Sequence, residues 1–309
     1  MSLRAELLRL GLRWSKRRAP NEPDIPAARA RLERVKRIVP NPPRGTQVRR
    51  LDAGGVRAVE VATPQSRRDH VVLYLHGGAY NYGAPSHYRD FIWRIAAAGG
   101  ARVLCIDYRL APEHPFPAAV DDAVAAYRWL LGTGAAPARS AVMGDSAGGG
   151  LVFGTLLRLR DEGIALPAAA VALSPWTDLA LTGPSLAGNA AADPMLKAAQ
   201  APALARHYLD GADPRHPYAS PLYGDPAGLP PSLIQVGSDE ILRDDAVRMA
   251  EKLRAAGCRV ELEVWPRMPH VWQLFARVLP EGRRAVARIG DFLRREMDAS
   301  NGMGANGRN

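Results

Sequence analysis

Short apolar segments alternate with helical patterns along most of this chain, and no other feature constrains its fold as strongly. Seven segments are typical of buried strands, and they lie near residues 56–62, 70–76, 101–107, 139–144, 168–174, 232–237 and 259–265. Strands that alternate with helices pair mostly in parallel, with helices on both faces of the sheet. The sequence therefore predicts an α/β fold, and its 309 residues can form one large domain with an added lid.

The stretch 178–230 breaks this alternation. It is rich in Ala, Pro and Gly, it has a helical piece near 194–210, and it contains no strand pattern. We expect it to be a cap insertion over the carboxyl edge of the sheet, within a catalytic domain spanning 46–299. The last ten residues, 300–309, have the composition of a disordered tail.

One strand-to-helix junction carries a serine between glycines, in the order Gly144-Asp145-Ser146-Ala147-Gly148. An apolar run precedes it and a helical pattern follows it. A chain that reverses so sharply crowds its neighbours, and glycine at 144 and 148 removes the side chains that would clash. A glycine-rich connection without chemistry is the alternative, but the flanking strand and helix favour a nucleophile elbow with Ser146 exposed.

A serine nucleophile needs a base, and the chain offers seven histidines. In α/β folds with such an elbow the order along the chain is nucleophile, acid, histidine, so the base should lie late. His270 follows the strand pattern at 259–265 in a Pro-containing loop. His207 and His216 lie in the Pro-rich insertion and are interpreted as surface or cap residues. The sequence therefore predicts His270 as the base.

The base in turn needs a carboxylate to orient it. Asp239 follows the strand pattern at 232–237, at the carboxyl end where open α/β sheets place their sites. Asp244 and Asp245 compete for the role, but they fall in the next helix, where acids commonly complement the helix dipole. We therefore expect Asp239 to be the acid.

The strand pattern at 70–76 breaks at His76-Gly77-Gly78-Ala79. Successive glycines let backbone N–H groups turn toward a developing negative charge. We expect Gly77, Gly78 and the N–H of Ala147 to form an oxyanion hole. His76 is expected to fix this loop by hydrogen bonding and not to act as a base.

Together these segments resemble the hormone-sensitive-lipase-like family of α/β hydrolases, in its bacterial GDSAG esterase branch. The matching segments, in the family's order, are HGGAY (76–80), DYRLAPEHPFPAA (107–119), GDSAGG (144–149), GSDEILRDD (237–245) and MPHVW (268–272). The resemblance implies Ser146, Asp239 and His270 as the triad. No cluster of metal-ligating residues is visible in the sequence, and the expected chemistry needs no cofactor. Ala79 departs from the third glycine of many members, although it still offers an N–H group.

Two structural expectations accompany the resemblance. Arg109 and Glu113 are expected to pair beneath the site. The residues that could wall a substrate pocket, although such side chains are equally common in protein cores, are Ala79, Tyr80, Trp176, Leu186, Met195, Leu196, Trp272 and Phe275.

Net charge is confined to the amino-terminal segment. The chain has a formal net charge of +10, the first 50 residues hold 14 Lys and Arg against 4 Asp and Glu, and the rest holds 27 of each sign. Leu3, Leu7, Leu10 and Trp14 share one helical face. We favour an amino-terminal cap (1–45) that packs this leucine stripe over the site, with a helix lying on an anionic membrane as the alternative. No nucleic-acid motif accompanies the charge.

Other features point to the cytoplasm. Arginines interrupt the first leucines, so no signal-peptide core is expected, and no apolar run is long enough to span a membrane. Cys105 and Cys258 are expected to be free thiols. Oligomeric state stays open, with a homodimer among the alternatives.

These features predict a serine carboxylesterase that hydrolyses small esters with short to medium acyl chains. A lactone hydrolase would use the same groups on a cyclic ester. A non-catalytic ligand-binding homologue is disfavoured, because such proteins typically lose a triad member.

Overall fold

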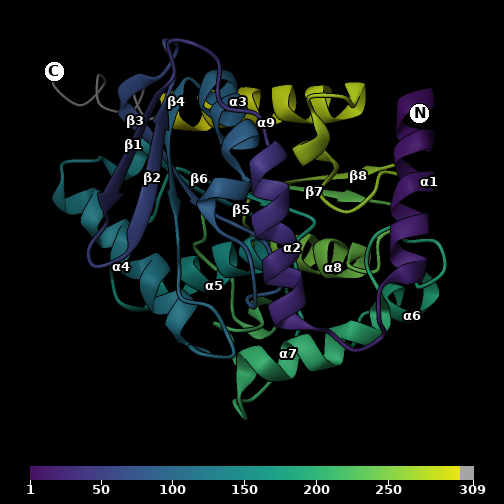
Figure 1. Cartoon of the computed structure of the whole chain (residues 1–309). Coiled ribbons are helices and arrows are strands. Elements are labelled where there is room, and N and C mark those ends of the chain that lie inside the picture. Colours follow the sequence, from purple (N-terminus) through teal and green to yellow (C-terminus); the bar gives the residue numbers. More distant parts are fainter. Residues whose placement is uncertain (300–309) are drawn as a thin grey trace, which may run out of the picture.

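The structure is a computed structural model, and it describes residues 1–299. An eight-stranded sheet forms the centre of the described chain, in the order β1-β2-β4-β3-β5-β6-β7-β8 (Figure 1). The strands are β1 (Gln47–Asp52), β2 (Arg57–Ala62), β3 (Arg67–Leu75), β4 (Ala101–Ile106), β5 (Ser140–Asp145), β6 (Ala169–Leu173), β7 (Ser232–Gly237) and β8 (Val260–Trp265). The strands from β4 to β8 in this order are parallel, whereas β2 pairs antiparallel with β1 and β4. The predicted mostly parallel sheet is confirmed.

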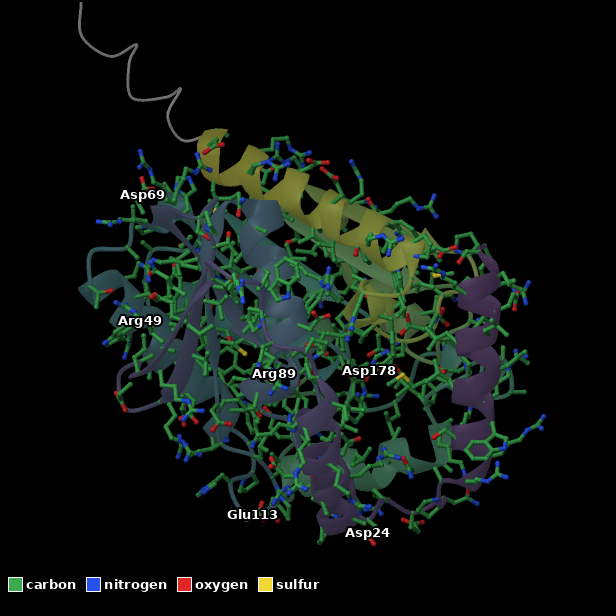
Figure 2. The ribbon with its side chains drawn as sticks, turned by 45° about the horizontal axis from the view of Figure 1, so that its top comes forward. Asp24, Arg49, Asp69, Arg89, Glu113 and Asp178 are labelled. Atoms are coloured by element: carbon green, nitrogen blue, oxygen red, sulfur yellow. The ribbon has the colours of Figure 1, made fainter. Side chains whose placement is uncertain are left out.

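The sequence pattern missed one strand, β1. Its sequence, QVRRLD, is exposed at nearly every position, so it lacks the apolar run that marks the other seven strands. Arg49 lies on this strand at the rim of the molecule (Figure 2) and pairs with Glu60 of β2. Charged side chains are typical of edge strands, where they discourage pairing with another chain.

Helices cover both faces of the sheet. The helices are α1 (Leu3–Arg18), α2 (Ile25–Ile38), α3 (Arg89–Gly99), α4 (Ala118–Gly132), α5 (Ala147–Asp161), α6 (Ser185–Gly188), α7 (Ala201–Leu209), α8 (Arg243–Ala255) and α9 (Pro280–Ala299). Side chains of α4, α5 and α8 fill the larger buried cluster on one face. Those of α3 and α9 fill the cluster on the other face (Figure 1). This three-layer arrangement is what alternating strands and helices predict.

The segment 178–230 contains the short helices α6 and α7 and no strand, as its composition predicts. The helix expected near 194–210 is α7, preceded by a 3-10 turn at Ala198–Gln200. None of the helices within residues 1–299 is both long and apolar enough to cross a membrane. The tail expected at 300–309 lies outside the described residues.

The amino-terminal segment folds as two helices, but α1 presents the opposite face from the one expected. Leu3, Leu7, Leu10 and Trp14 are 76, 59, 60 and 61% exposed, so the expectation that they pack over the site is wrong. Arg9 is buried instead, because its guanidinium pairs with Asp239 at 2.6 Å and donates to the carbonyl of Arg267. Ion pairing and carbonyl contacts, and not the leucine stripe, therefore orient this helix.

Candidate active site

Ser146 occupies a sharp turn between β5 and α5. Its backbone has φ 54° and ψ −122°, a conformation that L-residues adopt only under local constraint. A Cβ at Gly148 would lie 2.0 Å from the carbonyl oxygen of Leu75, and one at Gly144 would lie 2.4 Å from that of Gly148. The glycines are therefore required by close backbone packing, as the elbow pattern predicts.

His270 lies in the loop after β8, almost fully buried, and its ring meets a carboxylate. Nδ1 of His270 lies 2.7 Å from Oε2 of Glu240, not from Asp239. The expectation that Asp239 orients His270 is therefore wrong, and the neighbouring residue takes that position. Adjacent side chains leave the backbone in different directions, so only one of two consecutive acids faces the histidine.

Glu240 is held by two further hydrogen bonds at its other oxygen. Oε1 accepts from Ser174 Oγ at 2.8 Å and from the Gly237 N–H at 2.6 Å. Ser174 also accepts from the N–H of Val271, at 3.2 Å, and so connects the acid to the histidine loop. Sequence reasoning overlooked both Glu240 and Ser174; the signal for Glu240 was a second carboxylate at the same strand end.

The other acids near this strand end have structural partners. Asp239 binds Arg9 and accepts from Ser238 Oγ. Asp245 is buried and accepts from the N–H groups of Thr177 and Asp178, where the cap insertion begins. Burial, with the nearby charge of Asp178, raises the pKa of Asp245 to about 8. Asp244 accepts from the N–H of Ser185 at the start of α6.

Two opposing effects act on His270. Burial alone would lower its pKa, but the charge of Glu240 and the hydrogen bond to it outweigh burial and raise the pKa above its ordinary value. The charges of Asp193 and Asp145 also raise the pKa of His270. The pair is therefore built to stabilise a positive charge on the ring when His270 takes a proton.

The backbone donors expected for the oxyanion hole are shifted by one residue. The N–H of Gly77 already donates to Asp145 Oδ1 and to the Tyr88 hydroxyl, both at 2.9 Å, so the expectation for Gly77 is wrong. Within residues 1–299, the N–H groups of Gly78, Ala79 and Ala147 have no acceptor. Ala79 adopts φ 51° and Gly78 φ 124°, conformations that turn the backbone at this loop. Gly78, Ala79 and Ala147 are therefore the free donors beside the elbow.

Asp145 connects the two loops. It is buried beside the nucleophile and accepts from the hydroxyls of Tyr74 and Tyr88, at 2.7 and 3.0 Å, as well as from Gly77. Burial raises its pKa to about 6, although the tyrosine hydrogen bonds act to lower it. His76 fixes the same loop, as expected: Nδ1 bonds to the Gly77 carbonyl and the ring stacks on Tyr108.

Comparisons with known proteins agree with this geometry. The α/β-hydrolase-fold family profile matches residues 72–274. A crystal structure of an esterase from the bacterial hormone-sensitive lipase family superposes with a TM-score of 0.91 at 47% identity, over 96% of this chain and 99% of that one. The chain belongs to the hormone-sensitive-lipase-like family of α/β hydrolases. An acetyl-hydrolase of Streptomyces hygroscopicus is 51% identical over 235 residues, 76% of this chain and 79% of the relative. An esterase of Acinetobacter venetianus is 36% identical over 89% of this chain and 88% of the relative.

As a member of this family the chain is a carboxylic ester hydrolase. The substitution of alanine for the third loop glycine leaves a backbone donor in place, because the N–H of Ala79 has no acceptor among the described residues. The methyl group adds bulk at this point of the loop, and Ala79 is 9% exposed.

The eight proposed pocket residues separate into three groups. Ala79, Tyr80 and Trp176 lie beside the elbow: the N–H of Trp176 donates to the Ser146 carbonyl at 2.9 Å, and Tyr80 stacks on Tyr208 of α7. The residues of the cap insertion are Leu186, Met195 and Leu196. Trp272 and Phe275 pack in the small cluster under α1, with Ala5 and Met268.

Asp193 connects the cap insertion to the turn after β7 that carries Glu240. One oxygen of this buried carboxylate accepts from the N–H groups of Met195 and Leu196, at 2.8 and 2.9 Å. The other accepts from the N–H of Ile241, next to Glu240. Asp193 therefore places this part of the insertion against the turn that carries the acid.

The loop 107–119 makes different ion pairs from the one expected. Arg109 binds Asp122 of α4. Glu113 binds Arg29 of α2 through two hydrogen bonds of 2.6 and 2.7 Å, and Figure 2 shows Glu113 beside the start of α2. The expected Arg109–Glu113 pair is wrong, because each side chain meets an oppositely charged helix residue. Arg29 also donates to the carbonyls of Asn81 and Ala111 and so attaches α2 to the loop 76–81, here called the oxyanion loop after the role expected for it.

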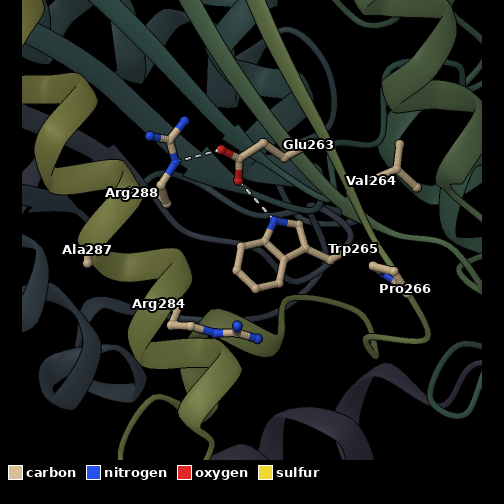
Figure 3. A pocket seen from close by; sticks show the side chains of 7 residues that line it. All are labelled: Glu263, Val264, Trp265, Pro266, Arg284, Ala287 and Arg288. Carbon is tan, nitrogen blue, oxygen red and sulfur yellow. Dashed lines mark hydrogen bonds and ion pairs between the residues drawn. The ribbon is translucent and has the colours of Figure 1, made fainter. Parts of the chain in front are cut away.

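A surface hollow of about 640 Å³ lies elsewhere, between β8 and α9 (Figure 3). Its polar groups bind one another: Glu263 accepts from Trp265 Nε1 and from Arg288, and Arg284 lies over the indole of Trp265. No triad candidate lines this hollow. Ser146, Glu240 and His270 instead follow the carboxyl ends of β5, β7 and β8.

Proposed function

We propose that this carboxylesterase acts through a Ser146–His270–Glu240 triad on esters with acyl chains of about four to eight carbons. The observation that carries the proposal is the hydrogen-bond chain from Ser174 through Glu240 to His270, on loops that flank the elbow. Each side chain in it is buried, so its geometry is set by the fold.

The reaction follows from these groups. Ser146 Oγ attacks the ester carbonyl carbon while His270 takes the hydroxyl proton, and Glu240 stabilises the imidazolium. The N–H groups of Gly78, Ala79 and Ala147 donate to the oxyanion. The C–O bond to the alcohol then breaks, and the alcohol leaves with the proton from His270. Water, activated by the same histidine, releases the acid and restores Ser146.

We further propose that residues 1–45 and 178–230 act together as a cap that limits the acyl pocket. Lys16 of α1 donates to the carbonyls of Ala190 and Asp193, so the two segments are joined. A roofed pocket has a fixed length. Each buried methylene adds about 0.8 kcal/mol until the pocket end is met, where overpacking costs about 1–3 kcal/mol.

The experiment is a series of p-nitrophenyl esters from acetyl to palmitoyl, with a triolein emulsion and a panel of lactones, measured as kcat/KM. We expect a maximum near butyrate to octanoate and poor activity on the emulsion. A maximum at laurate or longer would refute the chain-length proposal, and a preference for lactones would assign the cyclic ester as substrate. Ser146→Ala is the matched control, and it should lower kcat by about 10⁴–10⁶.

Cys105 and Cys258 are free thiols, Cys105 buried and Cys258 donating to the carbonyl of Pro226. We propose on this basis that the enzyme works in the reducing cytoplasm. Fractionation of cells that express the native chain tests the proposal, and recovery from an oxidising compartment would refute it.

A further inference from the structure

The side chains of Leu3, Leu7, Leu10 and Trp14, here called the outer stripe of α1, point away from the molecule. A helix advances about 100° per residue, which places these four positions within about 60° of one another. Each is at least 59% exposed. In Figure 1, α1 stands at the rim of the molecule, and its lower end lies beside the cap insertion and α6. A continuous exposed apolar surface of this kind marks an interaction site.

We propose that the outer stripe of α1 docks the protein on the surface of an anionic lipid bilayer. A stripe that packed over the site as part of the cap would be buried, whereas these four side chains are exposed and free to meet a lipid surface. The apolar side chains would enter the headgroup region while the helix lies in the plane of the surface.

The helix cannot easily turn this stripe inward, because its opposite face is fixed by polar contacts. Arg9 is 2% exposed and bound to Asp239 and the Arg267 carbonyl. Lys16 binds two carbonyls of the cap insertion, and Ser2 binds Glu281 of α9 through its N–H and its hydroxyl. The outer stripe is therefore a fixed surface of the folded protein.

The charges around the stripe determine which partner fits. Arg4, Arg17 and Arg18 are exposed on α1, and Arg18 stacks on the Trp14 ring at 3.5 Å. A tryptophan with a neighbouring arginine suits the membrane interface, where the ring is buried and the cation meets lipid phosphates. Each cation near an anionic surface adds roughly fivefold to affinity.

A second copy of this chain fits the stripe less well. The 3-7-10-14 spacing equals the seam of a helix pair, but the charged residues at the flanking positions would be Arg4, Glu6, Arg13 and Arg18. The one acid among them, Glu6, is already paired with Arg267. Two copies of α1 would therefore place arginines against arginines, whereas an anionic surface neutralises them.

The test is cosedimentation of the full chain with vesicles of phosphatidylcholine alone or mixed with phosphatidylglycerol. We expect binding to the anionic vesicles to be at least about tenfold stronger, and to weaken as salt screens the charges. A triple variant, Leu7→Gln/Leu10→Gln/Trp14→Gln, should lose at least about tenfold of this binding.

The matched control is Ile38→Gln/Val48→Gln/Val264→Gln, which removes three exposed apolar side chains from other elements and should bind like the wild type. Arg4→Gln/Arg17→Gln/Arg18→Gln should abolish the preference for anionic vesicles. Equal binding by the stripe variant and the wild type would overturn the proposal. So would a dimer in solution that the stripe variant dissociates, with no vesicle binding, since the occupant would then be a second copy.

If the stripe variant folds poorly, Trp14 fluorescence of the wild-type protein tests the same proposal. Trp14 emission, taken as the difference between wild type and Trp14→Phe, should be quenched by brominated lipids in anionic vesicles. Absence of quenching would contradict insertion of the stripe.

Discussion

At the scale of single residues, Glu240 and Asp239 are adjacent carboxylates with unrelated partners. Glu240 is buried and faces His270, while Asp239 faces Arg9 of the amino-terminal helix. The turn after β7 therefore carries both the residue that binds His270 and the residue that attaches α1.

Exchanging each acid for its amide should separate these roles. Glu240→Gln removes the charge that orients and stabilises protonated His270, and we expect kcat to fall by about 10²–10⁴. Asp239→Asn, the matched control, should stay within about fivefold of wild type when assayed well below its unfolding temperature. The reverse ranking would restore Asp239 as the acid.

The pH dependence of activity tests the environment of His270. The neutral ring is the base, and Glu240 raises the pKa of His270 above its ordinary value. Activity should therefore rise with pH through a midpoint above about 6.5 in kcat/KM for a soluble ester. In Glu240→Gln the charge is lost while burial remains, so the midpoint of the residual activity should move to lower pH. A wild-type midpoint below 6 would contradict the described pairing.

At the scale of elements, α1 is attached to the catalytic body through Arg9. Replacing Arg9 by Met leaves Asp239, whose side chain is 21% exposed, without its cation. We expect the free energy of unfolding to fall by about 2–3 kcal/mol, less than for a fully buried pair. Denaturant titration measures it.

The control is a second ion pair between α1 and the catalytic body, Arg267 in the loop after β8 with Glu6, in which the side chains are 55 and 40% exposed. Arg267→Gln should change the unfolding free energy by less than about 1 kcal/mol. An equal loss of unfolding free energy in Arg9→Met and Arg267→Gln would mean that the buried Arg9–Asp239 pair stabilises the protein no more than the exposed pair does.

At the scale of the whole molecule, the amino-terminal segment is a basic layer on an electrically balanced body. Deleting residues 1–45 would uncover Asp239, the cluster around Trp272, and the oxyanion loop that Arg29 holds. We expect a lower Tm and a higher KM for butyrate esters, with kcat changed less than in any triad variant. Unchanged Tm and KM would show that this layer is no part of the cap.

Local sequence determined the sheet and the elbow. Apolar runs fix which segments become buried strands, and seven of the eight strands followed from them. The glycines at 144 and 148 are dictated by backbone contacts within a few residues of the turn or on the adjoining strand, so the strand–turn–helix pattern sufficed to place Ser146.

Where the sequence offered several equivalent residues for one role, tertiary contacts decided which of them faces the proposed site. One strand end carries two adjacent acids, and one loop carries three consecutive backbone N–H groups. The members of each set are equivalent in the sequence until distant residues bind some of them. Arg9 binds Asp239, and Asp145 and Tyr88 bind the N–H of Gly77, which leaves Glu240, Gly78 and Ala79 for the proposed site. The orientation of α1 was decided in the same way, because a buried arginine with a carboxylate partner outweighed a stripe of leucines that hydrophobicity alone would have turned inward.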